Sequence, residues 1–179
     1  MRIFTIGHST RPLEEFIGML QGHAIEHLAD IRTMPRSRHN PQFNTDTFPA
    51  ALASAGIAYT HLPGLGGLRP KRAHSINTGW RNASFRAYAD YMQTEEFNGH
   101  IERLIAMAEN ERIALMCAEA VPWRCHRSLI GDALLVRNID VEEIVSAEKL
   151  APHTLTPFAQ AEGTRITYPS DEPATGQLF

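Results

Sequence analysis

Two patterns of hydrophobic and polar residues alternate along this chain, one typical of strands and one typical of helices. Short runs of apolar and β-branched residues predict strands over residues 2–6, 26–31, 57–61, 111–117 and 141–145. Apolar residues three and four positions apart predict helices over residues 12–21, 47–55, 85–92, 97–108 and 127–137. Strands that alternate with helices indicate βαβ units with right-handed crossovers. We therefore expect an α/β fold, with a mostly parallel sheet of about five strands and helices on both faces.

Capping residues and turn formers divide the chain further. Ser9 or Thr10 is expected to cap the first helix, and Thr94 to cap the helix over 97–108. The 179 residues suit one domain, which we place at residues 1–150. Small polar residues and prolines dominate residues 151–179, which predicts a poorly structured C-terminal tail.

Two irregular segments separate the predicted elements. Residues 33–45 read as a loop by composition, and residues 64–80 follow a glycine-rich turn, Pro63-Gly-Leu-Gly-Gly67. A connection as long as the second is uncommon without a function. We expect residues 64–80 to act as a loop or lid.

Polar side chains follow four of the predicted strands at the point where each strand ends. They are His8 and Ser9, then Asp30 and Arg32, then the glycine-rich turn, and finally Cys117 and Glu119. In open α/β sheets, ligands bind outside the carboxyl ends of the strands. The sequence therefore predicts a functional site at this edge of the sheet.

The residues at these strand ends resemble the DUF488 family, a group of bacterial and archaeal proteins with no assigned activity. The matching motifs are Thr5-Ile-Gly-His-Ser9, Asp30-Ile-Arg32, Pro35-x-Ser37-Arg38, Leu65-Gly-Gly67, Tyr88-x-x-Tyr-Met92, Cys117-Ala-Glu119 and Cys125-His-Arg127. The resemblance covers about residues 1–146. It implies an α/β fold and leaves the chemistry open.

Charge is unevenly distributed along the chain. Residues 31–89 contain eight basic residues and one acid, or +7, whereas the remainder has 9 basic and 19 acidic residues, or −10. Fifteen of the 17 basic residues are arginine, which suits bidentate contact with phosphate or carboxylate. The pattern favours an arginine-lined pocket for an anion, although such loops are also found simply exposed to solvent.

Candidate roles follow from residue type and place. The candidate catalytic residues are His8, Asp30, Cys117 and Glu119, and the candidate substrate-binding residues are Ser9, Arg32, Ser37, Arg38, Arg124, His126 and Arg127. Cys117 has the better position for a nucleophile, because the loop after a strand can wrap its amides round an anion. Cys125 has the better local environment for a thiolate, beside His126 and Arg127 near a helix start. Asp30 and Glu119 could be acid/base groups or could simply hold arginines in place.

A metal site is a further reading of the same residues. Cys117, Cys125 and His126 could ligate a metal with His8 or Asp30, but the Cys-x7-Cys-His spacing matches no standard zinc pattern. We therefore assign no metal ligands, and the sequence identifies no cofactor. Two cysteines cannot form a disulfide framework, which suggests a reducing cytoplasm. No apolar stretch approaches the length that spans a bilayer.

Two hypotheses for function remain. The first is an enzyme, a hydrolase or transferase that acts on a phosphate- or nucleotide-containing anion through Asp30 and Glu119 or through Cys117. The second is a non-catalytic module that binds nucleic acid through the +7 segment. The sequence favours the enzyme, because a binding surface has no need of a thiol and a carboxylate at a strand end.

Overall fold

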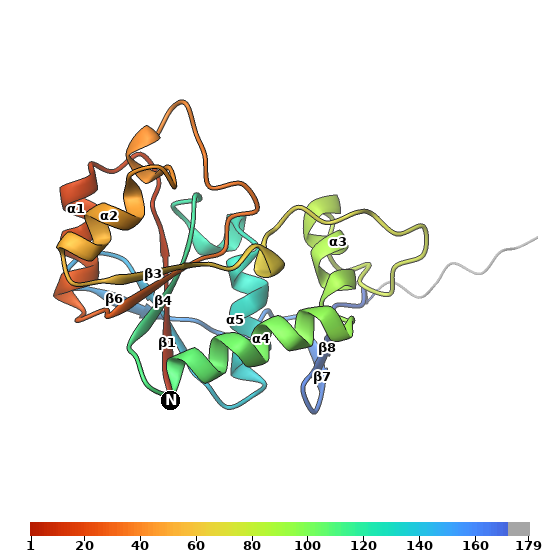
Figure 1. Ribbon diagram of the computed structural model, residues 1–179. Coiled ribbons are helices and arrows are strands. Elements are labelled where there is room, and N and C mark those ends of the chain that lie inside the picture. The colour runs from red at the N-terminus through yellow and green to blue at the C-terminus, as the bar shows by residue number, and fades with distance from the viewer. Residues whose placement is uncertain (172–179) are drawn as a thin grey trace, which may run out of the picture.

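A six-stranded sheet forms the centre of the protein, whose computed structural model describes residues 1–171. The strand order is β3-β2-β4-β1-β5-β6. The strands are β1 (Arg2–Gly7), β2 (His27–Asp30), β3 (Ala58–His61), β4 (Ile113–Cys117), β5 (Asp140–Ile144) and β6 (Leu150–Pro152). The first five are parallel, and β6 runs antiparallel to β5 (Figure 1). The predicted α/β fold is confirmed, and the five predicted strands are the five parallel ones.

Helices cover both faces of this sheet (Figure 1). They are α1 (Leu13–Gly22), α2 (Phe48–Ser54), α3 (Ala83–Tyr91), α4 (Glu95–Ala108) and α5 (Arg127–Leu135). Helices α1 and α2 pack on one face, and α4 and α5 pack on the other. Three single turns of 3-10 helix, at Pro41–Phe43, Pro63–Leu65 and Pro122–Arg124, lie in the connections.

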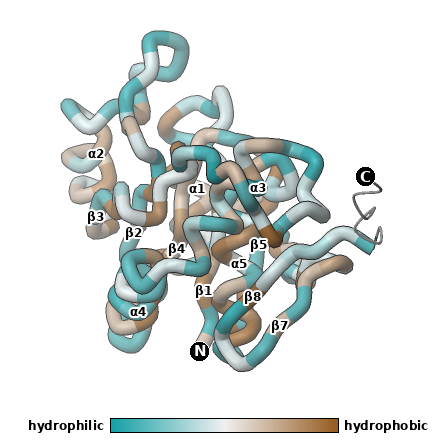
Figure 2. Tube along the Cα trace, turned by 90° about the vertical axis from the view of Figure 1, so that its right-hand side faces the viewer, coloured by the Kyte–Doolittle hydropathy of each residue, from teal (hydrophilic) through white to brown (hydrophobic). Residues whose placement is uncertain are grey.

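Alternation along the central strands explains why both faces are covered. In β1, Phe4 and Ile6 enter the core beneath α1 and α2, whereas Ile3 enters the core beneath α4 and α5. Every residue of β4 is buried. A parallel strand in the middle of a sheet is apolar on both sides, because helices cover both faces. Figure 2 shows the same distribution, with apolar residues along the central strands and hydrophilic ones in the outer turns.

The N-terminal caps of two helices were predicted, and the structure confirms one prediction and corrects the other. Thr94 caps α4, since its side chain accepts a hydrogen bond from the backbone N–H of Phe97. The expectation that Ser9 or Thr10 caps α1 is wrong, because the N-cap is Pro12 and no side chain caps that helix. Ser9 instead adopts a left-handed backbone conformation, with φ of 52°.

The segment after residue 150 differs from the poorly structured tail that its composition predicts. It contributes β6 to the sheet and then forms a two-stranded hairpin, β7 (Gln160–Glu162) and β8 (Arg165–Thr167). Tyr168 is fully buried and donates a hydrogen bond to Asp132 Oδ2 at 2.9 Å, while its backbone N–H donates to Asn77 Oδ1 at 2.9 Å. One buried aromatic residue thus ties the segment both to α5 and to the irregular loop at 64–80. The rest of the predicted tail, residues 172–179, lies outside the described residues.

The loop at 64–80 is irregular as predicted, apart from the turn at its start. Within residues 1–171, no helix is long and apolar enough to cross a membrane.

Gly7 marks the closest approach of two segments at the functional edge of the sheet. A Cβ at this position would lie 1.7 Å from the carbonyl oxygen of Glu119. The end of β1 can therefore lie against the chain that follows β4 only because residue 7 has no side chain.

We expect Gly7→Ala to lower the free energy of unfolding by about 1–3 kcal/mol, because the backbone must move to admit a methyl group. Urea denaturation measures the change. Gly18→Ala in α1 is the matched control, since a Cβ added there would have nothing within 4 Å. That variant should be neutral or more stable by up to about 1 kcal/mol, because alanine favours helix over glycine. Equal destabilisation of both variants would contradict the assignment.

Candidate functional site

Cys117 is the last residue of β4 and lies at the centre of the predicted edge. Its side chain is buried, and its strand is flanked by β1 and β2. The pairing with β1 continues past the strand ends, since His8 N–H donates to Cys117 O at 2.9 Å and Ser9 N–H to Ala118 O at 3.0 Å. The residues after β1 and after β4 are thereby held side by side.

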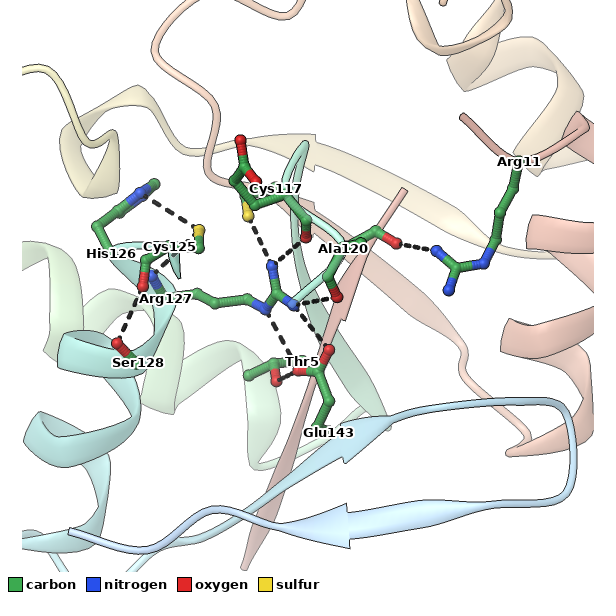
Figure 3. Close-up of polar contacts among 11 residues, drawn as sticks. Thr5, Arg11, Cys117, Ala120, Cys125, His126, Arg127, Ser128 and Glu143 are labelled. Atoms are coloured by element: carbon green, nitrogen blue, oxygen red, sulfur yellow. Dashed lines mark hydrogen bonds and ion pairs between the residues drawn. The ribbon is translucent and has the colours of Figure 1, made fainter. Parts of the chain in front are cut away.

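Arg127, the first residue of α5, organises the loop that leads from Cys117. Its side chain is fully buried, and all five of its N–H donors have acceptors (Figure 3). Two donate to the Glu143 carboxylate, at 3.2 and 2.7 Å, and two to the carbonyl oxygens of Glu119 and Ala120, at 2.6 and 3.0 Å. The fifth reaches the Cys117 sulfur at 2.9 Å. Arg127 thus has no N–H group left for a substrate.

The sulfur of Cys117 lies among groups that stabilise its thiolate. The hydrogen bond from the Cys125 thiol is the largest cause that lowers the pKa of Cys117, from about 9 to about 7, against the opposing effect of burial. The charge and hydrogen bond of Arg127 and the backbone N–H of Glu119 act in the same direction. Cys117 therefore ionises more readily than an ordinary cysteine thiol.

Cys125 lies beside Cys117 with the opposite character. Its hydrogen bond to Cys117 and its burial raise its pKa, so it stays a protonated thiol. Its sulfur also accepts the backbone N–H of Arg127 at 3.5 Å and lies 3.6 Å from His126 Nδ1. Burial lowers the pKa of His126 to about 4, so this imidazole is uncharged at neutral pH.

Asp30 and Arg32 form a second buried pair on the other side of Cys117. The Asp30 carboxylate accepts the Arg32 Nε–H at 2.9 Å, the Arg32 Nη2–H at 2.7 Å and the Tyr59 hydroxyl at 2.7 Å. It also accepts the backbone N–H of Arg32 at 3.1 Å. Because Asp30 already accepts these four hydrogen bonds, the structure supports its predicted role of holding an arginine in position.

His8 packs on the Arg32 pair rather than on the thiol. Its ring stacks on Phe43 with centroids 4.3 Å apart, and its Nε2 lies 3.4 Å from Arg32 Nη1. Burial lowers the pKa of His8 to about 4, so the ring is uncharged at neutral pH. Because a carbonyl oxygen only accepts, the 2.7 Å contact with Ser9 O assigns the ring proton to Nδ1. An uncharged His8 can accept a hydrogen bond from Arg32 but holds no positive charge of its own.

A pocket of about 370 Å³ opens above the thiol pair. Its polar wall contains Arg32, Cys117, Glu119, Arg124, Cys125 and His126, and its apolar wall contains Met34, Leu68 and Phe85. Glu119 and Arg124 are exposed at its rim, whereas Cys117 and Cys125 are buried at its base. The sites predicted at the ends of β2 and β4 therefore share one pocket.

Other predicted residues lie elsewhere. Among the described residues, the pocket wall does not include Ser37 or Arg38. Ser37 orders its own loop, because its hydroxyl accepts the backbone N–H groups of His39 and Asn40, and Arg38 is exposed. Ser9 contributes its backbone N–H, which donates a hydrogen bond to the carbonyl oxygen of Ala118. The sequence predicts one role for Arg124 and Arg127, and the structure separates them into an exposed and a fully buried arginine.

Glu143 is the residue that sequence reasoning missed. It lies in β5 opposite Thr5 of β1, whose hydroxyl donates to it, and it is the charge partner of Arg127. Its strand contains three acids, Asp140, Glu142 and Glu143, so the sequence carries no signal that singles out the one that pairs with Arg127. A buried carboxylate in a sheet requires a partner. Its loss would leave the charge of Arg127 buried and uncompensated, at a cost of about 3–5 kcal/mol.

A larger cavity, of about 720 Å³, lies on the other side of the Arg127–Glu143 pair. Its walls are mainly apolar, from the loop after Ala120, from β5 and from residues 151–158. We place the candidate site in the smaller pocket, because that pocket contains the thiols, Glu119 and Arg32, whereas the larger cavity contains only Arg127 of the predicted residues.

Comparison with protein families agrees with the motifs at the strand ends. The family model described as "Domain of unknown function DUF488" matches residues 12–134. The chain belongs to the DUF488 family. No match is found among curated proteins or among solved structures. Within residues 1–171, this DUF488 protein has no cluster of three or more His, Cys, Asp or Glu side chains that could hold a metal ion.

Alkylation tests the polarised thiol pair. Cys125→Ser leaves Cys117 as the only thiol and keeps a hydroxyl that can donate to it, so iodoacetamide should modify Cys117 with a rate midpoint near pH 7. The rate should fall about tenfold per pH unit below this midpoint, because only the thiolate reacts. Cys125→Ala removes the donor and should move the midpoint upward. Equal midpoints near pH 9 in both variants would contradict the assignment.

Proposed function

We propose that this DUF488 protein is a hydrolase or transferase that uses Cys117 as a nucleophile on an anionic substrate. The observation that carries the proposal is the 2.9 Å contact between Arg127 Nη1 and the Cys117 sulfur. A thiolate is the reactive form of cysteine, and an adjacent guanidinium keeps it available at neutral pH. The strand end then directs this thiolate at a pocket large enough for a small molecule.

The anion would be bound by the two arginines in the pocket wall. Arg124 is exposed at the rim, and Arg32 is held by Asp30 with its Nη1 toward His8. Arg32 keeps one Nη1–H for an anion, because its other N–H groups contact Asp30, the Phe43 carbonyl and His8. Arg124, at the rim, is the arginine that can make a bidentate contact with phosphate or carboxylate. Arg127 and Asp30 are positioning groups in this scheme, and His8 supports Arg32.

The remaining wall residues fit the other parts of a substrate. Met34, Leu68 and Phe85 offer apolar surface, and Met34 and Leu68 are both more than 70% exposed. A phosphate-containing substrate with a planar or apolar group, such as a nucleotide, would use both walls. Glu119 lies at the mouth, where its carboxylate can remove a proton from the water or alcohol that releases the product from Cys117.

The alternative, a nucleic-acid-binding module, has less support. Several basic side chains of the +7 segment bind acceptors within the protein: Arg32 binds Asp30, Arg69 binds the Gly64 and Gly66 carbonyls, and Arg86 binds the Trp80 carbonyl. These arginines shape their own loops. Binding of nucleic acid stays a prediction, to be tested by the salt dependence of affinity.

A pair of alkylating agents of different charge tests the anion pocket. In the Cys125→Ser background, the ratio of the iodoacetate rate to the iodoacetamide rate at Cys117 should exceed that of a free thiol in solution. Arg124→Gln should lower the ratio about fivefold, because the loss of one exposed charge beside the thiolate is worth about 1 kcal/mol.

Arg38→Gln is the matched control, since it removes the same charge from an exposed site outside the pocket wall. It should leave the ratio unchanged. A wild-type ratio equal to that of a free thiol, or equal effects of the two variants, would contradict the proposal.

A further inference from the structure

The base of the pocket holds two thiols, and a single nucleophile needs only one. Cys117 ends β4, whereas Cys125 follows the turn at Pro122–Arg124 and comes two residues before Arg127. Both sulfurs face Arg127, one toward its guanidinium at 2.9 Å and the other toward its backbone N–H at 3.5 Å (Figure 3). Cys117 and Cys125 also both lie in the wall of the same pocket. One residue thus binds the sulfurs of two cysteines from separate segments.

The two sulfurs have the unequal character that dithiol chemistry requires. Cys117 has the lowered pKa of an attacking group, and Cys125 has the raised pKa of a thiol that stays protonated until it is used. Both line the pocket, and both are free rather than joined in a disulfide. A small electrophile that reaches Cys117 therefore also reaches Cys125.

We propose that Cys117 and Cys125 act as a redox pair that reduces a hydroperoxide and closes to a disulfide. This activity depends on the reactive Cys117 thiolate of the proposed function and adds a second catalytic residue, Cys125. In the first step the thiolate attacks the outer peroxide oxygen, the O–O bond breaks, and the alkoxide or hydroxide that leaves takes a proton from water. Cys117 becomes a sulfenic acid.

The second step forms the S–S bond and releases water. The Cys125 sulfur attacks the Cys117 sulfur, the S–O bond breaks, and the hydroxide leaves with the proton of the Cys125 thiol. His126 Nδ1 lies 3.6 Å from the Cys125 sulfur, and its ring is uncharged, so it can relay that proton. A low-molecular-weight thiol then reduces the disulfide by exchange and is itself oxidised to a disulfide.

The arrangement of the loop suits this closure. Arg127 holds the carbonyl groups of Glu119 and Ala120, whereas residues 123 and 124, next to Cys125, are exposed. The Cys125 end of the segment is therefore the end that can move toward Cys117. Closure would also remove the Cys117 nucleophile, which makes the hydrolase or transferase activity dependent on reduction.

Hydrogen peroxide and three forms of the protein test the inference. In the wild type, peroxide should remove two hydrogen atoms from the intact mass, abolish both free thiols and give a Cys117–Cys125 linked peptide. In Cys125→Ser, reaction should stop at a sulfenic acid that dimedone traps on Cys117. Cys117→Ser should consume peroxide, in the presence of dithiothreitol, at least about tenfold more slowly than the wild type, because the raised pKa of Cys125 leaves it unreactive.

The outcomes separate this inference from the proposed function. If iodoacetamide modifies Cys117 at neutral pH but peroxide gives no intramolecular disulfide in the wild type, the redox pair is wrong and the nucleophile stands. Over-oxidation of Cys117 at the same rate in the wild type and in Cys125→Ser would likewise overturn the role of Cys125. If neither reagent reacts with Cys117, both proposals fail.

Discussion

The buried guanidinium of Arg127 is the interaction on which the candidate site depends. Its five N–H groups contact a carboxylate of β5, two loop carbonyls and the sulfur at the end of β4. A buried charge is tolerated only when it is paired and fully hydrogen-bonded, so these acceptors cannot be moved independently. The position of the loop, the charge state of Cys117 and the start of α5 are thereby set together.

A second pair, Asp30 and Arg32, serves the opposite side of the pocket in a similar way. In both pairs the carboxylate belongs to a strand, Asp30 to β2 and Glu143 to β5, and the arginine lies outside the strands. The two arginines differ in the number of free N–H donors, because Arg127 has used all five whereas Arg32, in the pocket wall, keeps one at Nη1. Arg127 thus stabilises the thiolate, whereas Arg32 and Arg124 line the pocket in which the proposal places an anionic ligand.

The walls of the pocket come from segments with little regular structure. Leu68 belongs to the loop at 64–80, and this loop is anchored through Asn77 to Tyr168 near the end of the described chain. Trp80 continues the contact by packing against Phe158 and Tyr168. The C-terminal segment therefore supports the loop at 64–80, although it lies outside the range matched by the family model.

Local patterns in the sequence are enough to define the order of the elements and the edge of the sheet at which polar groups gather. Periodicity and strand-end chemistry are local signals, so the five parallel strands, the helices and the proximity of Arg32, Cys117 and Glu119 could all be predicted. Residues 151–168 could not, because their packing depends on a few buried contacts such as that of Tyr168 rather than on composition. The choice of the arginine that contacts the thiol is likewise a property of the folded chain alone. Cys117 and Glu143 lie on different strands, and the pairing of β1 with both β4 and β5 brings them to one guanidinium.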